Sequence, residues 1–585
     1  MLRRPIIYLA LIIIIYLILL LPTLERYGIA YDEQTDIDIA RSYISQEWGW
    51  LNGSLSDINQ VRLPMYFIAI IFFLLRTMSL FVARLVSCIM GALTIIAVYI
   101  FCKRKYNFKK GLLACFILAT NPFFLSFSRI AFTESDIFVT CALSWTLICV
   151  SILQEKRTVG WAILTSIILG LALSSKISAI ATFPAIFLSL TVFPGDKSHL
   201  KNIQSYNKIA ITVSFFALLF ITIIGGWSIR YLIKSMVYFP WFNLSHYTLV
   251  LFCWIAIVIY FFWHRKFVMK PLMLGFFVLT FSFLTFLVIP PVHTTTPEIV
   301  MELVKVYFPQ MIRMTRARLT FLIPKFSLFH FGCVVFKSSL LMGAWFWLSL
   351  FMTIIQSRYR KEVRLPLLMF IFYFLFIIKL PWVQTFYMVP LLPILAIFAS
   401  DQFFELYAKR RLHAVILAFL AICSLSIDFF LCYPDYNLNG FQWLGARILW
   451  GEPTLGYRSI VQTTSDGVEQ ALRWANNNIR SGETVVTYIQ PQHIIQAICP
   501  NPEFKIIDGL VDLGQSILMN ADYVISDINK ELEGFGSSDP TYKYPPDLRL
   551  LKSNFTKVFS VKRAFGIEVA SVWRKNAVPD RVRLP

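Results

Sequence analysis

The residues best suited to chemistry lie in one acidic segment close to the N-terminus. The segment that starts at Tyr31 reads YDEQTDID and holds four carboxylates, Asp32, Glu33, Asp36 and Asp38. It directly follows an apolar run, Pro5 to Leu21, that is long enough to cross a bilayer. A carboxylate can act as general base on an incoming hydroxyl group. The position of this cluster therefore predicts acid–base chemistry at a membrane surface.

Basic side chains and a second acidic pair recur where later apolar runs end, on the face that the loop charges assign to the acidic segment. These residues are Arg62, Arg84, Arg129, Glu134, Asp136, Lys176 and Lys379. A charge at the end of a span is costly unless it reaches the interface, pairs with another charge or lines a wet cavity. For Arg129, Lys176 and Lys379, we favour an anion site that faces carboxylates. Because Lys and Arg stabilise a departing phosphate, the set suits group transfer from a phosphate-bearing lipid.

Each of these residues also has a purely structural explanation. Asp32 would otherwise be a solvated loop acid, or a cap for a helix over Asp36–Tyr43. Glu134 and Asp136 would otherwise cap the span that follows them. A lone lysine at a span end, such as Lys176, can simply extend its ammonium to the interface. The sequence alone leaves these alternatives open.

The composition places the chain among polytopic membrane proteins. Of its 585 residues, 57% are hydrophobic and only 15% are charged, against about 25% charged in a typical soluble domain. Apolar runs recur, and we count about thirteen that can span the hydrocarbon, among them Leu112 to Phe127 and Ile209 to Trp227. The net charge of +21 is explained by Lys and Arg clusters in short loops, so nucleic-acid binding is not expected.

The same basic clusters predict the topology. The N-terminal Met-Leu-Arg-Arg sequence places the first residues in the cytoplasm, and basic loops at 102–110 and 154–157 fall on the same side. The acidic segment then lies on the outer face, and the C-terminal portion lies outside. We expect a multi-pass protein of the plasma (cell) membrane with a cytoplasmic N-terminus.

After the last predicted span the composition becomes that of a soluble domain. Val468–Ala475 reads as an amphipathic helix, and Glu483–Ile489 and Ala521–Asp527 read as buried strands. About 150 residues suffice for a small α/β domain. We therefore expect a mostly α protein with a transmembrane domain over 1–432, juxtamembrane helices on the outer face, and an extracytoplasmic α/β domain over 433–585.

Several segments, taken in order, resemble the C-type-fold glycosyltransferases of the dolichyl-phosphate-mannose protein mannosyltransferase and aminoarabinose transferase superfamily. The matching segments are Tyr31–Glu33, Arg62–Phe67, Ala83–Ile95, Gly111–Ala114, Ala119–Phe123, Ser128–Asp136, Gly170–Lys176, Lys379, Phe386–Pro393 and Tyr433–Tyr436. The likeness is best over residues 1–200 and patchy to residue 440. The middle outer loop, 290–332, lacks a soluble insert, which favours a prokaryotic-type relative.

The resemblance implies an inverting glycosyltransferase that moves a hexose or pentose from a polyprenyl-phosphate donor to a hydroxyl of a lipid, glycan or protein. In the family, the Asp of the first outer loop is the catalytic base. Asp32 stands at that position, and Glu33 would support it. Arg129, Glu134 and Asp136 would line the same cavity, and Lys379 would face the donor phosphate. We assign Arg62, Arg84, Lys176 and Tyr387 to the same substrate- and phosphate-binding site. The family name points to mannosyl transfer and protein glycosylation in the cell envelope.

Cofactors and rival functions are less well defined. The seven His residues offer no obvious ligands for the metal found in some relatives, so no cofactor is assigned and a divalent cation stays open.

Two other functions compete with sugar transfer. They are another polyprenyl-lipid-linked group transfer and the transport of a lipid or glycan. A transporter would show internal repeats, and we find none. The expected partners are the lipid-linked donor, membrane lipid and an acceptor.

Overall fold

The computed structural model covers the chain as two compact units. One unit is Met1–Leu21 with Ile39–Ile422, and the other is Pro22–Asp38 with Cys423–Pro585. The structure describes residues 3–24, 31–45, 63–131, 136–192, 212–214, 216, 244–263, 268–288, 325–357, 359–378, 385–432, 467–487, 503–508, 520–527, 551, 553–562 and 568–576. The domain boundary predicted at residue 432 stays a prediction.

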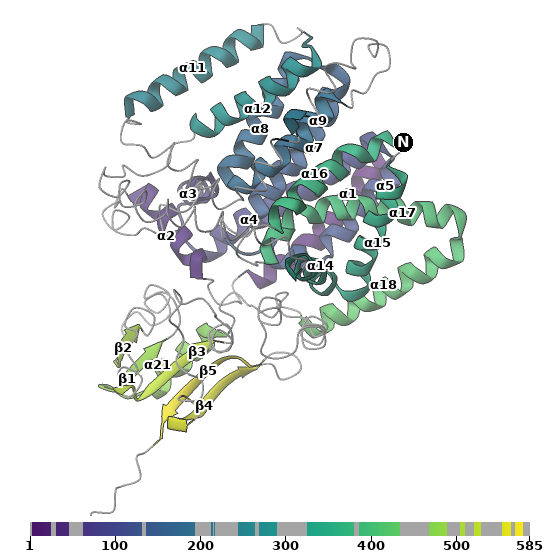
Figure 1. Cartoon of the computed structure of the whole chain (residues 1–585). Helices are drawn as coiled ribbons and strands as arrows, with labels where there is room; N and C mark the ends of the chain where they lie inside the picture. The colour runs from purple at the N-terminus through teal and green to yellow at the C-terminus, as the bar shows by residue number, and fades with distance from the viewer. Residues whose placement is uncertain are drawn as a thin grey trace, which may run out of the picture. The chain divides into compact units, whose positions relative to one another are not determined.

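Helices make up most of the described residues (Figure 1). In chain order they are α1 (Arg3–Leu20), η1 (Leu21–Thr23), α2 (Tyr31–Ser45), α3 (Leu63–Leu75), α4 (Leu80–Lys105), α5 (Phe108–Ala119), α6 (Pro122–Ser128), α7 (Ile137–Lys156), α8 (Val159–Ser175), η5 (Ile177–Thr182), α9 (Phe183–Thr191), α11 (Leu244–Trp263), α12 (Pro271–Val288), α14 (Lys325–Lys337), α15 (Leu340–Gln356), η7 (Lys361–Val363), α16 (Arg364–Ile377), η8 (Thr385–Leu391), α17 (Leu392–Lys409), α18 (Arg411–Cys432) and α21 (Val468–Asn478). The labels with η are 3-10 helices.

Five helical segments in the described part are long and apolar enough to cross a membrane, and a bent helix pair would make a sixth. They are Arg4–Thr23, Leu80–Lys105, Ile137–Lys156, Tyr387–Lys409 and Arg411–Phe429. The prediction of a mostly helical, polytopic membrane protein is therefore confirmed. The count of thirteen spans stays a prediction. One of those spans, Ile209 to Trp227, lies almost entirely outside the described residues.

The acidic segment differs from the prediction. Helix α2 begins at Tyr31 rather than at Asp36, so Asp32 and Glu33 lie in its first turn. Acidic residues in a first turn are stabilised by the helix dipole, which explains the earlier start.

Helix α2 is anchored near its C-terminal end. There the Arg41 guanidinium (Nη2) donates a 2.8 Å hydrogen bond to the carbonyl of Met78. This bond fixes the end of α2 to the loop before α4.

A predicted single span, Leu112 to Phe127, is broken into α5 and α6, which meet at 66°. The break has a local cause. The side chain of Asn121 accepts a 3.1 Å hydrogen bond from the backbone N–H of Phe124, and Pro122 occupies the first turn of α6. An Asn cap followed by Pro is a strong start signal for a new helix. As a result, Arg129 lies at the end of a short separate helix, α6.

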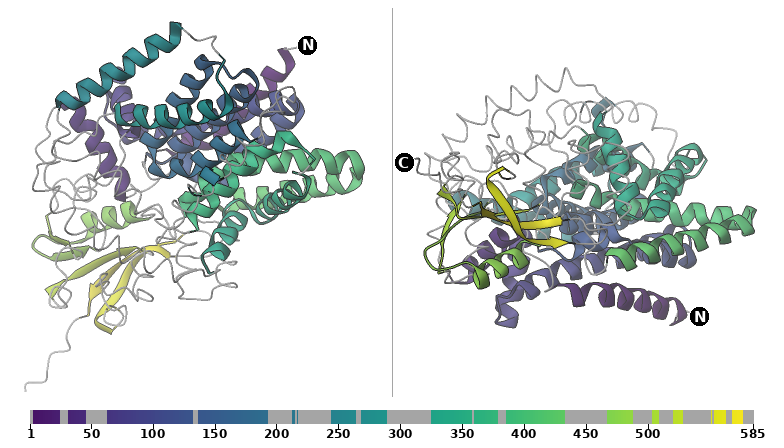
Figure 2. Two further views of the ribbon diagram at one scale, coloured as in Figure 1. Left: turned by 45° about the horizontal axis from the view of Figure 1, so that its top comes forward. Right: turned by 90° about the horizontal axis from the view of Figure 1, so that it is seen from below.

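The centre of the first unit is formed by neighbouring helices that pack closely (Figure 2). Helix α7 packs against both α4 and α8, and α8 packs against α12. Gly170 permits the last contact, because a Cβ there would lie only 2.5 Å from the Cβ of Thr285. Small residues allow membrane helices to approach in this way. This packing sets the positions at which α7 and α8 begin and end.

A buried charge cluster ties together α5, α17 and the loop before η7. Asp401 is only 1% exposed, and its carboxylate accepts a 2.7 Å hydrogen bond from each of Lys110 Nζ and Arg360 Nη1. Burial opposes the charge of Arg360, but hydrogen bonds to Asp401 and Glu362 outweigh this and hold the pKa of the guanidinium above its usual value. The cluster is therefore a fixed structural contact.

The described part of the second unit contains a five-stranded sheet in the order β2-β1-β3-β5-β4. Its strands are β1 (Thr484–Thr487), β2 (Lys505–Asp508), β3 (Tyr523–Asp527), β4 (Phe555–Lys562) and β5 (Glu568–Lys575). The strands β2, β1 and β3 are parallel, and β5 is antiparallel to both β3 and β4. Together with α21, the sheet confirms that this part mixes helix and strand.

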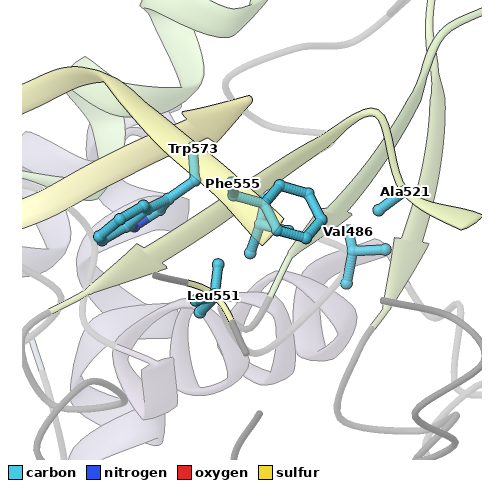
Figure 3. Packing of buried hydrophobic residues seen from close by; sticks show 6 residues of the cluster. Val486, Ala521, Leu551, Phe555 and Trp573 are labelled. Carbon is cyan, nitrogen blue, oxygen red and sulfur yellow. The ribbon is translucent and has the colours of Figure 1, made fainter. Parts of the chain in front are cut away.

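The core of the sheet domain is one apolar cluster (Figure 3). Val524 lies directly opposite Trp573 in the β3–β5 register, so both side chains share one face. Val486, Ala521, Leu551 and Phe555 complete the cluster. The predicted helix at 468–475 and the two predicted strands all form, as α21, β1 and β3. Strands β2, β4 and β5 were not predicted.

Candidate functional site

A buried ion pair joins the start of α7 to the end of α8. The ammonium nitrogen of Lys176 lies 2.8 Å from Oδ1 of Asp136. The Asp136 side chain is fully buried, and that of Lys176 is 15% exposed. The same ammonium lies 4.5 Å from the centre of the Tyr387 ring. The structure thus brings together three residues that the sequence analysis singled out.

The backbone conformation of Asp136 explains how its carboxylate reaches Lys176. Asp136 precedes α7 with φ +65°, in the left-handed region. Asp is one of the few residues other than Gly that adopt this conformation. Its side chain makes no capping hydrogen bond to α7. The alternative in which Asp136 serves as a side-chain cap for α7 is therefore wrong, because the carboxylate is engaged with Lys176 instead.

Lys176 is a single residue with an extended backbone between α8 and η5. Its φ and ψ are −160° and 130°. Its N–H donates to Ala172 in the last turn of α8, and its carbonyl accepts from Ala179 in η5. The residue thus belongs to both segments at once. The ammonium does not simply extend to the interface, since it is held by a buried carboxylate.

Tyr387 is supplied by η8, a 3-10 segment that leads into α17. A cation above a tyrosine face is attracted by the electrons of the ring, by about 0.5–2 kcal/mol depending on how far it is shielded from water. The Lys176 ammonium is therefore held from two sides, by a carboxylate and by a ring. An ammonium carries three N–H groups, which are donors of the kind that bind phosphate oxygens.

The structure also reveals a pair of residues that the sequence analysis missed. The hydroxyls of Ser178 and Tyr373 are 2.9 Å apart and buried. The only sequence signal was a lone tyrosine in the apolar run of α16, and such a residue is usually an interfacial anchor.

Two predicted arginines lie on elements next to this group. Arg84 in α4 and Arg129 at the end of α6 are each only 3% exposed. Helix α6 packs against both α4 and η8, the segment that carries Tyr387. Buried arginines are rare unless their charge is matched. That both guanidinium groups serve the same ligand as Lys176 stays a prediction.

The other predicted site residues cannot be placed with this group. Arg62, Glu134, Lys379 and the side chain of Asp32 lie outside the described residues. Glu33 is fully buried in the part of α2 that belongs to the second unit. The catalytic role of the acidic segment therefore stays a prediction. Among the residues that the structure describes, no group of three or more His, Cys, Asp or Glu could hold a metal ion.

A small apolar crevice borders Tyr373. It is lined by α4, α7, η5, α16, η8 and α17, and its few polar side chains are Ser144, Thr182 and Tyr373. Tyr373 thus contacts Ser178 through its hydroxyl and borders the crevice as well. The chemical centre of the group is the ammonium of Lys176, a donor of the kind that binds anionic oxygens, held by the Asp136 carboxylate and the Tyr387 ring.

Comparison with known families supports this interpretation. Residues 62–227 match the family model described as dolichyl-phosphate-mannose-protein mannosyltransferase. The match confirms the resemblance found in the sequence, over a segment that contains Arg84, Arg129, Asp136 and Lys176. No curated protein sequence matches the chain significantly.

Two solved structures show weaker likeness. One is the oligosaccharyltransferase of Archaeoglobus fulgidus in complex with Zn and sulfate, with 12% identity and a TM-score of 0.48, covering 97% of this chain and 73% of that chain. The other is ArnT from Cupriavidus metallidurans bound to undecaprenyl phosphate, with 13% identity and a TM-score of 0.47, covering 98% of each chain.

Proposed function

We propose that this chain, which carries the dolichyl-phosphate-mannose-protein mannosyltransferase match over residues 62–227, is a membrane glycosyltransferase with a polyprenyl-phosphate sugar as donor. The observation that carries the proposal is the buried pair of Asp136 and Lys176, 2.8 Å apart and inside the matched segment. A paired charge at the ends of apolar helices is costly to build, and such groups in membrane proteins mark substrate sites by default.

The proposed reaction is a single displacement with inversion. Asp32 takes the proton of an acceptor hydroxyl while the hydroxyl oxygen attacks C1 of the sugar. The new C1–O bond forms as the bond from C1 to the phosphate oxygen breaks, and the departing lipid phosphate takes the electron pair. Cationic groups then stabilise the extra charge on that phosphate. Asp32 releases its proton to solvent after the glycoside leaves.

The ion pair changes the role proposed for Lys176. Together, Asp136 and Lys176 carry no net charge, so Lys176 alone adds little long-range attraction for an anion. The pair instead holds the ammonium at a fixed point. A cation held in this way stabilises the negative charge that develops in the transition state without first having to move. Arg84 and Arg129, both buried and both inside the matched segment, are the further cations that we propose for the donor phosphate.

The cellular setting follows from the loop charges. We propose a multi-pass protein of the plasma membrane with its N-terminus in the cytoplasm and both the site and the C-terminal α/β part on the outer face. Its acceptor is a hydroxyl of a lipid, glycan or protein, and its donor sugar is a hexose or pentose. Mannosyl transfer in cell-envelope or protein glycosylation is the specific case that the matched family suggests.

The direct test follows release of the lipid phosphate. Purified protein in detergent is incubated with a panel of polyprenyl-phosphate sugars, and free polyprenyl phosphate is measured. We expect release with at least one sugar, and no release for Asp32→Asn. Asp38→Asn, from the same acidic segment, is the matched control and should retain activity. Absence of release across the panel, or normal turnover of Asp32→Asn, would contradict the proposal.

A further inference from the structure

The bond between Ser178 and Tyr373 connects parts of the chain that are distant in sequence. The two residues are 195 positions apart, and their hydroxyls are 2.9 Å apart. Ser178 is 7% exposed, and Tyr373 is 1% exposed. One residue belongs to η5 and the other to α16. The bond therefore fixes the short η5 segment to α16.

The position of η5 determines the position of Lys176. Ser178 is two residues beyond Lys176, and the backbone carbonyl of Lys176 accepts the first hydrogen bond of η5, from Ala179. A shift of η5 would therefore move the backbone from which the ammonium extends. Because the ammonium must meet Asp136 at 2.8 Å, a displacement on the order of 1 Å would disturb the pair.

Segment η5 is largely buried, but its last residue borders an unfilled space. Thr182 of η5 lines the apolar crevice, together with Ser144 of α7 and Pro390 of η8. Atoms that line an unfilled space lose dispersion contacts on that side. The hydroxyl pair is thus a specific, directional restraint in addition to the packing of η5.

From this geometry we infer that Tyr373 is a positioning residue for the sugar-transfer site, whose hydroxyl acts through Ser178 and η5 to hold Lys176 between Asp136 and Tyr387. The inference rests on the proposed function, because it assumes that Lys176 meets the donor phosphate. Tyr373 itself touches no substrate in this account. Its effect on the reaction is transmitted entirely by Lys176.

The test uses Tyr373→Phe, which keeps the ring and removes one hydroxyl. Binding of polyprenyl phosphate, without sugar, is measured by the ligand-induced shift in melting temperature of the full chain. A neutral hydrogen bond is worth about 0.5–1.5 kcal/mol, so we expect binding to weaken about two- to tenfold. Ser178→Ala should give the same loss, and the double variant should lose no more than either single one.

Two further variants separate positioning from general destabilisation. Trp345→Phe removes another bond between helices, from the indole N–H to the carbonyl of Ala399 at 3.1 Å, and should leave the affinity unchanged. In the Asp136→Asn/Lys176→Met background, Tyr373→Phe should cause no further loss of affinity. Residues that act through one another are non-additive in this way.

The outcomes are distinct. If the wild type binds polyprenyl phosphate and Tyr373→Phe binds it equally well, the positioning role is wrong and the proposed function stands. A full additional loss in the background without Lys176 would likewise overturn it, since the effect would not pass through Lys176. If the wild type shows neither binding nor release of the lipid phosphate, the proposed function fails, and this inference fails with it.

Discussion

Removing the charge of Lys176 should destabilise the helical unit strongly. Lys176→Met keeps a side chain of similar length but leaves the Asp136 carboxylate buried without its ammonium partner. The two charges are 2.8 Å apart, and at an effective dielectric constant of about 20 their attraction is about 6 kcal/mol. Desolvation offsets part of this, and breaking a buried pair typically costs about 3–5 kcal/mol. We expect a loss in that range.

The assay is equilibrium unfolding of the purified protein in detergent, followed by the fluorescence of its tryptophans. Lys156→Met is the matched control. Lys156 is an exposed lysine at a helix end whose ammonium lies 5.6 Å from the ring centre of Trp161. Its loss should cost about 1 kcal/mol or less. The comparison separates loss of a buried pair from loss of any lysine near a ring.

The double variant gives the stricter test. Asp136→Asn/Lys176→Met removes both charges, so no buried carboxylate is left unpaired. Replacing a whole buried pair with neutral groups is often nearly neutral, and we expect most of the lost stability to return. If Lys176→Met is as stable as Lys156→Met, or if the double variant is no more stable than Lys176→Met, the ion pair of Asp136 and Lys176 does not stabilise the helical unit as argued.

Two further predictions concern elements that support the site. Asp401→Asn leaves Lys110 and Arg360 without their shared carboxylate and should lower stability by about 3–5 kcal/mol, measured by the same unfolding assay, and a change below about 1 kcal/mol would contradict the contact. Asn121→Ala removes the cap of α6, which accepts from Phe124 at 3.1 Å, and should cost about 1 kcal/mol. Unchanged unfolding of Asn121→Ala would show that the cap does not fix α6.

Much of the helical architecture could be predicted, because apolar runs in a membrane protein are bounded by charges. Helix α4, for example, ends at Lys103, Arg104 and Lys105, as its basic cluster indicates. Breaks within such runs were harder to predict. The Asn121–Pro122 signal that separates α5 from α6 lies inside a run that is apolar enough to be counted as one span. A hydropathy value averaged over a long window is dominated by the apolar neighbours of Asn121 and Pro122, so it does not reveal the break.

The candidate site was predictable in its charged residues but not in their pairing. The sequence indicated Asp136 and Lys176. It left Asp136 between a role in the substrate site and a helix cap, and Lys176 between an anion site and the membrane interface. Their actual contact depends on the left-handed backbone at Asp136 and on the close packing of α7 and α8. Ser178 and Tyr373 meet across 195 residues, and nothing local predicts such a contact.

The sheet domain shows the same limit. Strands β1 and β3 are buried, apolar and parallel, so they are recognisable as continuous apolar runs. Strand β4 alternates between buried and exposed residues and carries two register irregularities against β5. A bulge shifts the alternation of side chains, and this weakens the period-two pattern by which such a strand would be found.

The central claim, sugar transfer from a lipid phosphate, is tested most directly by measuring polyprenyl phosphate released from a panel of polyprenyl-phosphate sugars by the wild type and by Asp32→Asn. The account predicts release by the wild type with at least one donor, and loss of release in Asp32→Asn, which should still fold and bind polyprenyl phosphate. Release by Asp32→Asn at the wild-type rate, or no release by the wild type with any donor, would contradict it.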